Sequence, residues 1–181
     1  MEFDGEREIA ATRQEVFDAL NDPEVLSRSI PGCEDFQKLS DTEMEATIVN
    51  KIGPVTAKFK CKIALSDIVA PESYTLSGEG SGGGSIAKGS AKVSLDDLGE
   101  KTMLHYTFNA DISGKLAQLG SRLIEGSVAK LTDDFFNVFS ANVTGADVSK
   151  LQTSNVLQNA SRTVWVILGL IAVGIAAWLL L

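Results

Sequence analysis

The residues that most often carry catalysis are few in this chain and form no recognisable catalytic group. The only histidine, His105, falls on the strand face opposite to Tyr106 in the alternating pattern around it, so it is expected to point outward. No nucleophile can be assigned beside it, and acid–base or nucleophilic catalysis needs such a partner. We therefore predict no catalytic residue and no enzymatic activity, with His105 exposed to solvent.

Metal, redox and phosphate chemistry are not indicated either. Cys33 and Cys61 are the only cysteines, and their spacing matches no metal motif. In a reducing compartment they are expected to be small core side chains, with a disulfide or a zinc site as the alternatives. The glycines from Gly78 to Gly84 lack the following helix and the Lys-Ser/Thr ending of a phosphate loop. No metal site and no tightly bound cofactor is predicted.

The charge balance argues against nucleic-acid binding. Sixteen basic residues face twenty-four acidic ones, giving a net charge of −8, whereas phosphate binding needs clustered Lys and Arg. Lys58, Lys60 and Lys62 alternate along one predicted strand and form a basic stripe. A solvated face is the simpler interpretation, and a docking site or contact with anionic lipid headgroups is the alternative.

The middle of the chain alternates with period two, which is typical of strands with one buried face. The pattern is clearest over residues 55–65, where Val55, Phe59 and Ile63 share one face. Turn residues separate this stretch from similar ones. The predicted strands are residues 2–9, 33–39, 43–52, 55–65, 73–80, 86–95 and 103–112. Seven strands connected in this way form a curved antiparallel sheet.

Three helices are predicted around this sheet. Thr12 and Glu15 form a capping box that begins a short helix, and Asp22 followed by Pro23 begins a second one. Residues 115–143 show helical spacing of apolar residues. The apolar face of this long helix is predicted to contain Leu116, Leu119, Leu123, Ser127, Leu131, Phe135 and Val138 or Phe139. Sheet and helix must cover each other, so the predicted fold is α+β, with the sheet gripping the long helix.

Small residues on the inner face of the sheet indicate a cavity for an apolar ligand. Gly89 and Ala91 share a strand face with Val93, and small side chains there leave space unfilled. The predicted lining is Phe17, Leu20, Ile48, Asn50, Phe59, Ile63, Tyr74, Gly89, Ala91, Tyr106, Phe108, Leu119 and Leu123. The alternative is a packed interior, in which Leu123 and Phe135 fill the gap and the glycines only permit bends.

Three residues of the predicted lining carry polar side chains. Asn50, Tyr74 and Tyr106 point inward in the strand pattern and can form hydrogen bonds with ligand oxygens. Backbone partners or positions at the sheet edge would explain them equally well. They are the candidate polar contacts in an otherwise apolar wall.

A loop beside the predicted cavity mouth combines an apolar residue with a rigid turn. Ile30, Pro31 and Gly32 form this loop. Exposed apolar surface on a loop commonly marks contact with a partner. We therefore predict that these three residues dock a partner protein.

The C-terminal segment is predicted to cross a membrane. Residues 164–181 carry no polar side chain except the indoles of Trp165 and Trp178, and a helix of this length spans roughly 27 Å. The two tryptophans lie near its ends, where indole rings anchor helices at the membrane interface. Arg162 precedes the segment, so the N-terminal domain is expected to stay in the cytoplasm. The alternative, a buried helix of the domain, would normally carry a polar stripe.

These patterns divide the chain into three parts. Residues 1–143 form the predicted ligand-binding domain, residues 144–162 a polar tether rich in Ser, Asn, Gln and Thr, and residues 163–181 the transmembrane anchor. The first residues lack the positive and apolar regions of a secretory signal. The predicted localisation is the inner membrane, with a single span and a cytoplasmic domain.

Five strings of residues are specific enough to identify a family. They are Asn-Asp-Pro-Glu-Val-Leu (21–26), Ile-Pro-Gly-Cys-Glu (30–34), Lys-Ile-Gly-Pro-Val (51–55), Tyr-Thr-Leu-Ser-Gly-Glu-Gly (74–80) and Lys-Leu-Ala-Gln-Leu-Gly-Ser-Arg-Leu-Ile (115–124). Together they resemble the CoxG-like family of carbon monoxide dehydrogenase subunits, within the START-like (SRPBCC) helix-grip superfamily. The resemblance covers about residues 1–143.

The resemblance implies an accessory protein for the molybdenum-containing CO dehydrogenase, which carries its own molybdenum, iron–sulfur and flavin centres. Such proteins are associated with bringing that soluble enzyme to the membrane, and the superfamily uses its cavity for hydrophobic ligands. A quinone is the candidate ligand, because electrons leaving the enzyme must reach a lipid-soluble carrier. Members without a neighbouring CO dehydrogenase exist, so a related molybdenum hydroxylase is the alternative partner.

Three functions are therefore open at this point. A quinone-handling membrane adaptor uses the anchor, the tether and the cavity together. A pure membrane anchor or assembly factor needs no ligand. A cyclase-like enzyme of the same superfamily would need acid–base groups in the cavity, which the sequence does not indicate.

Deleting residues 164–181 should release a folded domain into the soluble fraction, because the predicted core makes no use of them. Ultracentrifugation followed by circular dichroism of the supernatant measures this, and the full-length chain, which should sediment with membranes, is the control. Inclusion bodies of the truncated chain would contradict the prediction.

Overall fold

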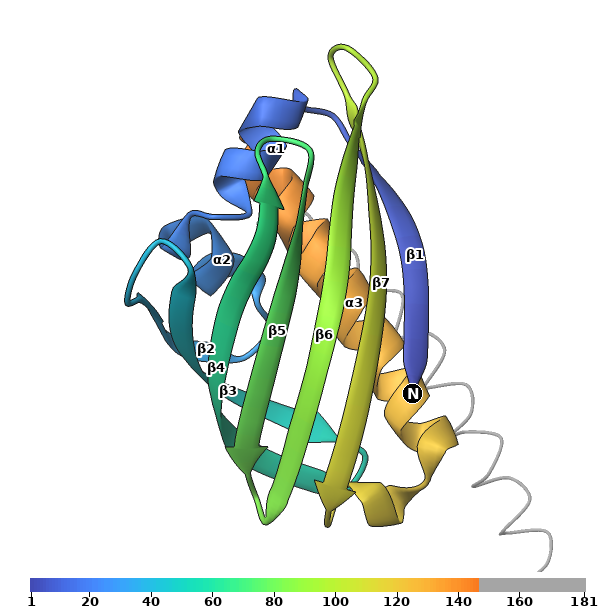
Figure 1. Ribbon diagram of the computed structural model, residues 1–181. Coiled ribbons are helices and arrows are strands. Elements are labelled where there is room, and N and C mark those ends of the chain that lie inside the picture. Colours follow the sequence, from blue (N-terminus) through green and yellow to red (C-terminus); the bar gives the residue numbers. More distant parts are fainter. Residues whose placement is uncertain (147–181) are drawn as a thin grey trace, which may run out of the picture. The chain divides into compact units, whose positions relative to one another are not determined.

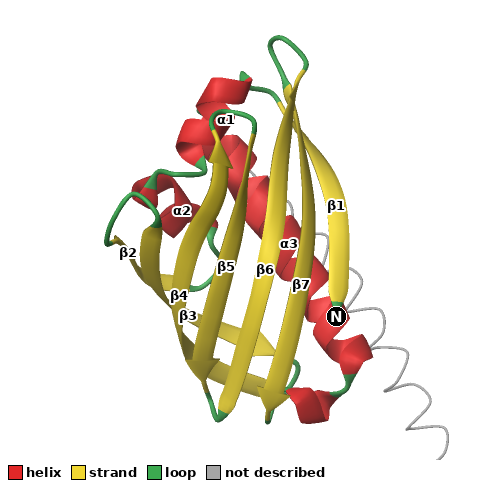
Figure 2. Ribbon diagram, in the orientation of Figure 1, coloured by secondary structure: helices red, strands yellow, loops and turns green. Residues whose placement is uncertain are grey.

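The computed structural model describes residues 1–146 (Figures 1 and 2). The predicted anchor and all but the first residues of the predicted tether lie outside this range. The elements are β1 (Glu2–Ile9), α1 (Arg13–Ala19), α2 (Pro23–Ser29), β2 (Cys33–Lys38), β3 (Glu43–Ile52), β4 (Val55–Val69), β5 (Ser73–Gly82), β6 (Ser85–Asp97), β7 (Thr102–Gly114), the short 3-10 helix η1 (Ala117–Leu119) and α3 (Ser121–Thr144). None of the helices in residues 1–146 has the length and apolarity needed to cross a membrane.

All seven strands belong to one antiparallel sheet with the order β1-β7-β6-β5-β4-β3-β2. Each strand neighbours the next in sequence except β1, which pairs with β7, so Phe3 lies opposite Phe108 and Gly5 opposite Tyr106. The sheet curves around α3, which crosses its concave side (Figure 1). The predicted seven-stranded sheet and its C-terminal helix are confirmed.

The two short helices begin at the predicted caps. The backbone N–H of Thr12 donates to the Glu15 carboxylate at 2.8 Å, and the Thr12 hydroxyl accepts from the Glu15 N–H. Asp22 caps α2 by accepting from the Glu24 N–H at 2.7 Å. Because side-chain oxygens satisfy the free N–H groups of the first turn, both helices are stable despite their length of seven residues.

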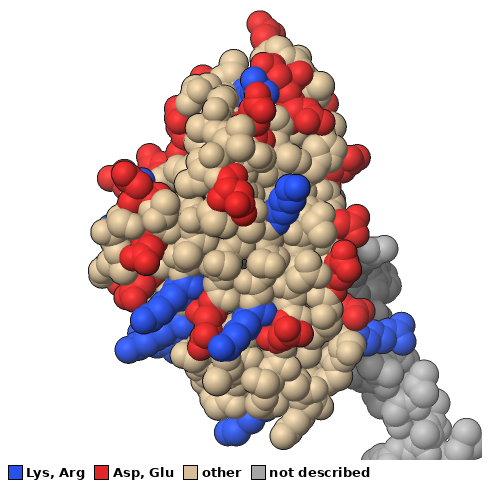
Figure 3. All heavy atoms as spheres, viewed as in Figure 1, with Lys and Arg blue, Asp and Glu red and all other residues tan. Residues whose placement is uncertain are grey.

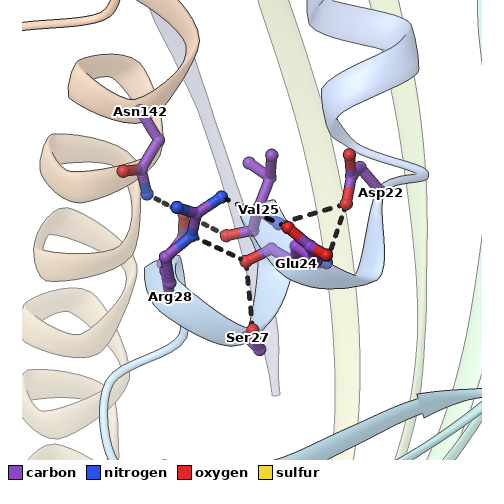
Figure 4. Close-up of polar contacts among 7 residues, drawn as sticks. Asp22, Glu24, Val25, Ser27, Arg28 and Asn142 are labelled. Atoms are coloured by element: carbon purple, nitrogen blue, oxygen red, sulfur yellow. Dashed lines mark hydrogen bonds and ion pairs between the residues drawn. The ribbon is translucent and has the colours of Figure 1, made fainter.

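A polar contact fixes α2 to the last turns of α3 (Figure 4). The Asn142 amide donates to the Ser29 hydroxyl at 2.9 Å, and that hydroxyl donates to the Val25 carbonyl at 2.7 Å. Ser29 is only 1% exposed, so its hydroxyl makes both hydrogen bonds away from solvent. The contact therefore holds the C-terminal half of α3 against α2.

The predicted helix over residues 115–143 was wrong at its start. Gly120 has φ +85°, a left-handed conformation that ends η1, and α3 begins at Ser121. Leu116, the first residue of the predicted face, precedes η1 and is buried as predicted. Within α3 the first buried side chain is that of Ile124 and not that of the predicted Leu123. Leu123 is instead 42% exposed.

The tightly packed core lies where α1, α2 and the C-terminal half of α3 meet the sheet. Its most buried large side chains are those of Ile9, Val16, Leu104 and Phe139. Burying such side chains stabilises a fold by about 1.5 to 3 kcal/mol each. This end of the sheet therefore anchors α3.

Replacing Gly89 with Ala should destabilise the protein by about 1 to 3 kcal/mol. A Cβ atom there would lie 2.5 Å from the Asn109 carbonyl oxygen and 2.9 Å from the Phe108 ring. The control is Gly126→Ala in α3, where nothing lies within 4 Å and the change should stabilise the helix by roughly 0.5 to 1 kcal/mol. Urea unfolding should move the two midpoints in opposite directions. An unchanged midpoint for Gly89→Ala would show that both the Asn109 backbone and the Phe108 ring move aside at little cost.

Candidate ligand-binding cavity

Two neighbouring cavities lie between the inner face of the sheet and α3. The larger has a volume of about 660 Å³ and the smaller about 340 Å³, and we call them the large and the small compartment. They share the lining residues Asn50, Ile63, Leu76, Phe108 and Val128. The large compartment falls within the range of roughly 300 to 1,000 Å³ that is usual for small-molecule sites. The predicted gap beneath the helix is therefore open space.

The walls of the large compartment are mainly apolar and come from both layers. Helix α3 contributes Val128, Ala129, Leu131, Thr132, Asp133, Phe135 and Phe136, and the sheet contributes Phe3, Leu65, Tyr74, Leu76, Ala91, Val93, Leu104, Tyr106 and Phe108 among others. Leu20 and Leu26 cover one side. Such walls favour a ligand with a large apolar surface.

Several polar side chains interrupt this wall, and they include the three predicted ones. Asn50, Tyr74 and Tyr106 all line the large compartment. Tyr74 is 5% exposed, and burial raises the pKa of its hydroxyl, so the group stays protonated and can donate a hydrogen bond. Within residues 1–146 every fully buried side-chain polar atom has a partner. The polar groups of the cavity are thus the ones left to face a ligand.

An ion pair between β1 and α3 closes one side of the large compartment. The Arg7 guanidinium donates to the Asp133 carboxylate and lies 5.6 Å from the centre of the Phe136 ring. Arg7 and Asp133 were not among the predicted site residues. Arg7 could have been found from the sequence, because it alternates in phase with the inward Phe3, Gly5 and Ile9 of its strand.

Aromatic rings of β7 lie over glycines of the neighbouring strands. A Cβ atom on Gly5 would lie 2.4 Å from the Tyr106 hydroxyl, and one on Gly89 would meet the Phe108 ring. Gly89 lines the small compartment, as expected, but the room that it leaves is taken by Phe108 rather than by a ligand. Phe3 stacks on Phe108 with ring centres 5.9 Å apart.

The structure brings most of the predicted lining residues to the two compartments. The large one contains Leu20, Asn50, Tyr74, Ala91, Tyr106 and Phe108, and the small one contains Asn50, Phe59, Gly89 and Phe108. Phe17 packs instead in the core, with its ring 6.0 Å from that of Tyr74. Leu119 and Leu123 line neither compartment, because the break at Gly120 turns them away.

The residues predicted to dock a partner lie at the edge of the cavity. Ile30 ends α2, and Ile30 and Pro31 line the large compartment. Gly32 has φ +73°, and a Cβ atom there would lie 2.0 Å from the Val49 carbonyl oxygen. The backbone conformation and the close approach of Val49 therefore explain why a glycine is needed at this position. Trp165 and Trp178 lie outside the described residues.

The strand register places the basic stripe and His105 on the outer face of the sheet. Figure 3 shows Lys and Arg side chains beside Asp and Glu side chains on that face. Lys58 pairs with Glu34 at 2.5 Å, and Lys62 pairs with Glu45 at 3.8 Å. His105, with a side chain 41% exposed, lies 3.1 Å from the Asp96 carboxylate and 3.7 Å from that of Glu6. Neighbouring carboxylates thus pair with much of this basic charge.

Both thiols are free and only partly buried, rather than fully buried core side chains. Burial raises the pKa of Cys33 and of Cys61. Cys61 lines the small compartment. A raised pKa lowers the thiolate fraction at neutral pH, so both thiols are expected to react slowly with alkylating reagents.

A curved antiparallel sheet around a long C-terminal helix, with an apolar cavity between them, defines a START-like helix-grip protein. The solved structure of a START superfamily protein from Mycobacterium smegmatis superposes with a TM-score of 0.62 at 12% identity, covering 80% of this chain and 97% of that one. The Zhui aromatase/cyclase from Streptomyces sp. R1128 gives 0.58 at 10% identity, covering 80% and 93%. These two similarities show the fold.

The family follows from a more specific match. The family model of the carbon monoxide dehydrogenase subunit CoxG matches residues 5–144, and this chain belongs to that family. The structure of a conserved protein from Geobacillus kaustophilus is 29% identical, with a TM-score of 0.76, and covers 80% of this chain and 96% of that one. No curated protein sequence matches the chain significantly.

Replacing Ala91 with Phe should keep or raise the melting temperature of the ligand-free protein. Ala91 lines the large compartment, so the phenyl ring would fill empty apolar space. The control is Ala46→Phe on the inner face of β3, since Ala46 is buried but lines neither compartment. There the ring would overpack the core at a cost of about 1 to 3 kcal/mol. Equal destabilisation of both variants, in thermal melts of delipidated protein, would mean that the large compartment is not available.

Proposed function

We propose that this protein is a membrane-anchored accessory protein of a molybdenum-containing CO dehydrogenase, or of a related molybdenum hydroxylase, and that its cavity binds a quinone or another lipid. The observation that carries the proposal is an apolar cavity of about 660 Å³ in a member of the CoxG family. The protein would recruit the soluble enzyme to the inner membrane and couple it to the respiratory chain. It would not itself be catalytic.

The chemistry of the large compartment supports a quinone. A quinone has an apolar ring system with two carbonyl oxygens, which accept hydrogen bonds but donate none. Tyr74 and Tyr106 place hydroxyl donors, and Asn50 an amide donor, in an otherwise apolar wall. A ligand with acidic or basic groups would need charged partners in the wall. There the charged side chains of Arg7 and Asp133 already pair with each other.

The proposed anchor rests on the sequence of residues 164–181 and its two tryptophans. With the domain tethered to the membrane, a ligand that dissolves only in lipid has a short path to the cavity. The proposed docking residues, Ile30 and Pro31, lie at the cavity wall, where a bound partner would be close to the ligand. The anchor, the docking loop and the cavity would then act together in passing electrons from the enzyme to the quinone.

The proposal predicts that the full-length protein, purified from membranes of its native host, carries a quinone. Solvent extraction followed by mass spectrometry should find quinone in wild type and much less in Ala91→Phe at equal protein amount. In the same cells, CO dehydrogenase activity should sediment with membranes and become soluble when residues 164–181 are deleted. Membrane recruitment without any bound quinone or lipid would favour a pure anchor. Activity that stays soluble with the intact protein would contradict recruitment.

A further inference from the structure

We infer that the two compartments bind the two ends of one ligand, an oxygen-bearing ring in the large compartment and an aliphatic, isoprenoid-type tail in the small one. The inference rests on the proposed function, because it concerns the ligand of the same cavity. It assigns the position and direction of that ligand, and it assigns a ligand-binding role to the small compartment.

The two compartments lie side by side and share part of their lining, so a molecule that crosses the shared part would occupy both. Asn50, Phe108 and Val128 belong to both linings and mark the junction from β3, β7 and α3 respectively. Residues Ala91 and Ala87 lie on the same face of β6, one in each compartment. Four residues of strand separate them by about 13 Å. Gly89 lies between them under the Phe108 ring, so a ligand passing from one compartment to the other crosses over that ring.

The polar side chains are unevenly divided between the compartments. The hydroxyls of Tyr74, Tyr106 and Thr132 line only the large one. Hydrogen-bond donors are needed by a ring with carbonyl oxygens and are of no use to a hydrocarbon chain. The ring is accordingly assigned to the large compartment.

The inward side chains of the small compartment are almost all apolar. They include Ile48, Ile52, Phe59, Ile112 and Leu116. The charged members of its lining belong to the opposite face of the sheet: Lys88 pairs with Glu79 at 3.0 Å, and Lys62 pairs with Glu45. A hydrocarbon tail is the ligand chemistry that such walls select.

The small compartment also has a floor without bulky side chains. Gly78, Gly80, Ala87 and Ala110 lie beside one another on β5, β6 and β7. At its end, the Leu116 N–H donates to the buried Ser85 hydroxyl at 3.0 Å and holds the start of η1 against β6. The result is a narrow space between the sheet and the segment that precedes α3.

Ala87→Phe and Ala91→Phe test the assignment on the full-length protein in detergent micelles. The probes are ubiquinone-2 and the same benzoquinone ring with a methyl group in place of the prenyl chain, measured by isothermal titration calorimetry. Ala87→Phe should weaken ubiquinone-2 binding at least about tenfold and leave the tail-less ring within about twofold, because it blocks only the tail. Ala91→Phe should abolish binding of both. Ser90→Phe, on the outer face of β6, is the matched control and should change neither.

Cys61 gives a second readout that needs no variant, because it lines the small compartment and Cys33 lines neither. Ubiquinone-2 should slow alkylation of Cys61 by N-ethylmaleimide, followed by peptide mass spectrometry, about fivefold or more, whereas the tail-less ring should not. Cys33 is the internal control. If Ala87→Phe fails to fold, this measurement on wild type decides the matter.

The outcomes separate this inference from the proposed function. Unprotected Cys61, or ubiquinone-2 binding that is unaffected in Ala87→Phe, would overturn the head-and-tail assignment while quinone binding stands. Equal loss of both probes in a folded Ala87→Phe variant would place the ring in the small compartment and overturn it too. Failure of both probes to bind wild type would instead contradict quinone as the ligand.

Discussion

The cavity depends on packing that is concentrated at one end of α3. Phe139 in its C-terminal half is buried together with Ile9, Val16 and Leu104, and Asn142 ties the same turns to α2 through Ser29. This packing fixes how far the helix stands from the sheet. Further along, the inner face of the sheet carries small residues such as Ala87 and Ala110, which are too short to reach the helix. Open space remains between α3 and the sheet because the helix is held at one end and the sheet below it carries small residues.

The same arrangement explains how an apolar interior tolerates polar groups. A buried hydroxyl or amide without a partner costs free energy, so such groups are uncommon in a packed core. Tyr74, Tyr106 and Asn50 avoid part of this cost because they line open space, where water or a ligand can reach them. Arg7 and Asp133 avoid it differently, by pairing with each other across β1 and α3. The unpaired polar groups of the cavity are therefore the ones that line open space.

The strands and caps could be predicted from the sequence because their signals are local. Period-two alternation placed Ala91, Tyr106 and Phe108 on the inner face, and two short capping patterns placed α1 and α2. Predictions failed where a distant contact or a single backbone angle determines which way a side chain points. The positive φ of Gly120 restarts the helix and turns Leu123 outward, and nothing in the apolar spacing of the neighbouring residues indicates that break.

Local sequence patterns could not predict contacts between residues that are distant in the sequence. A small residue indicates room, but only the packed structure shows whether a ring of the protein fills that room, as Phe108 does over Gly89, or whether it stays open, as it does beside Ala91. Leu104 and Phe136 belong to the core and also line the large compartment, whereas Ala87 and Ala110 line only the small one. Substitutions at these two small residues can therefore change which ligand fits without removing core contacts of α3. The core contacts thus hold α3 in place over the sheet, and the side chains that line the space between helix and sheet decide which ligand fits.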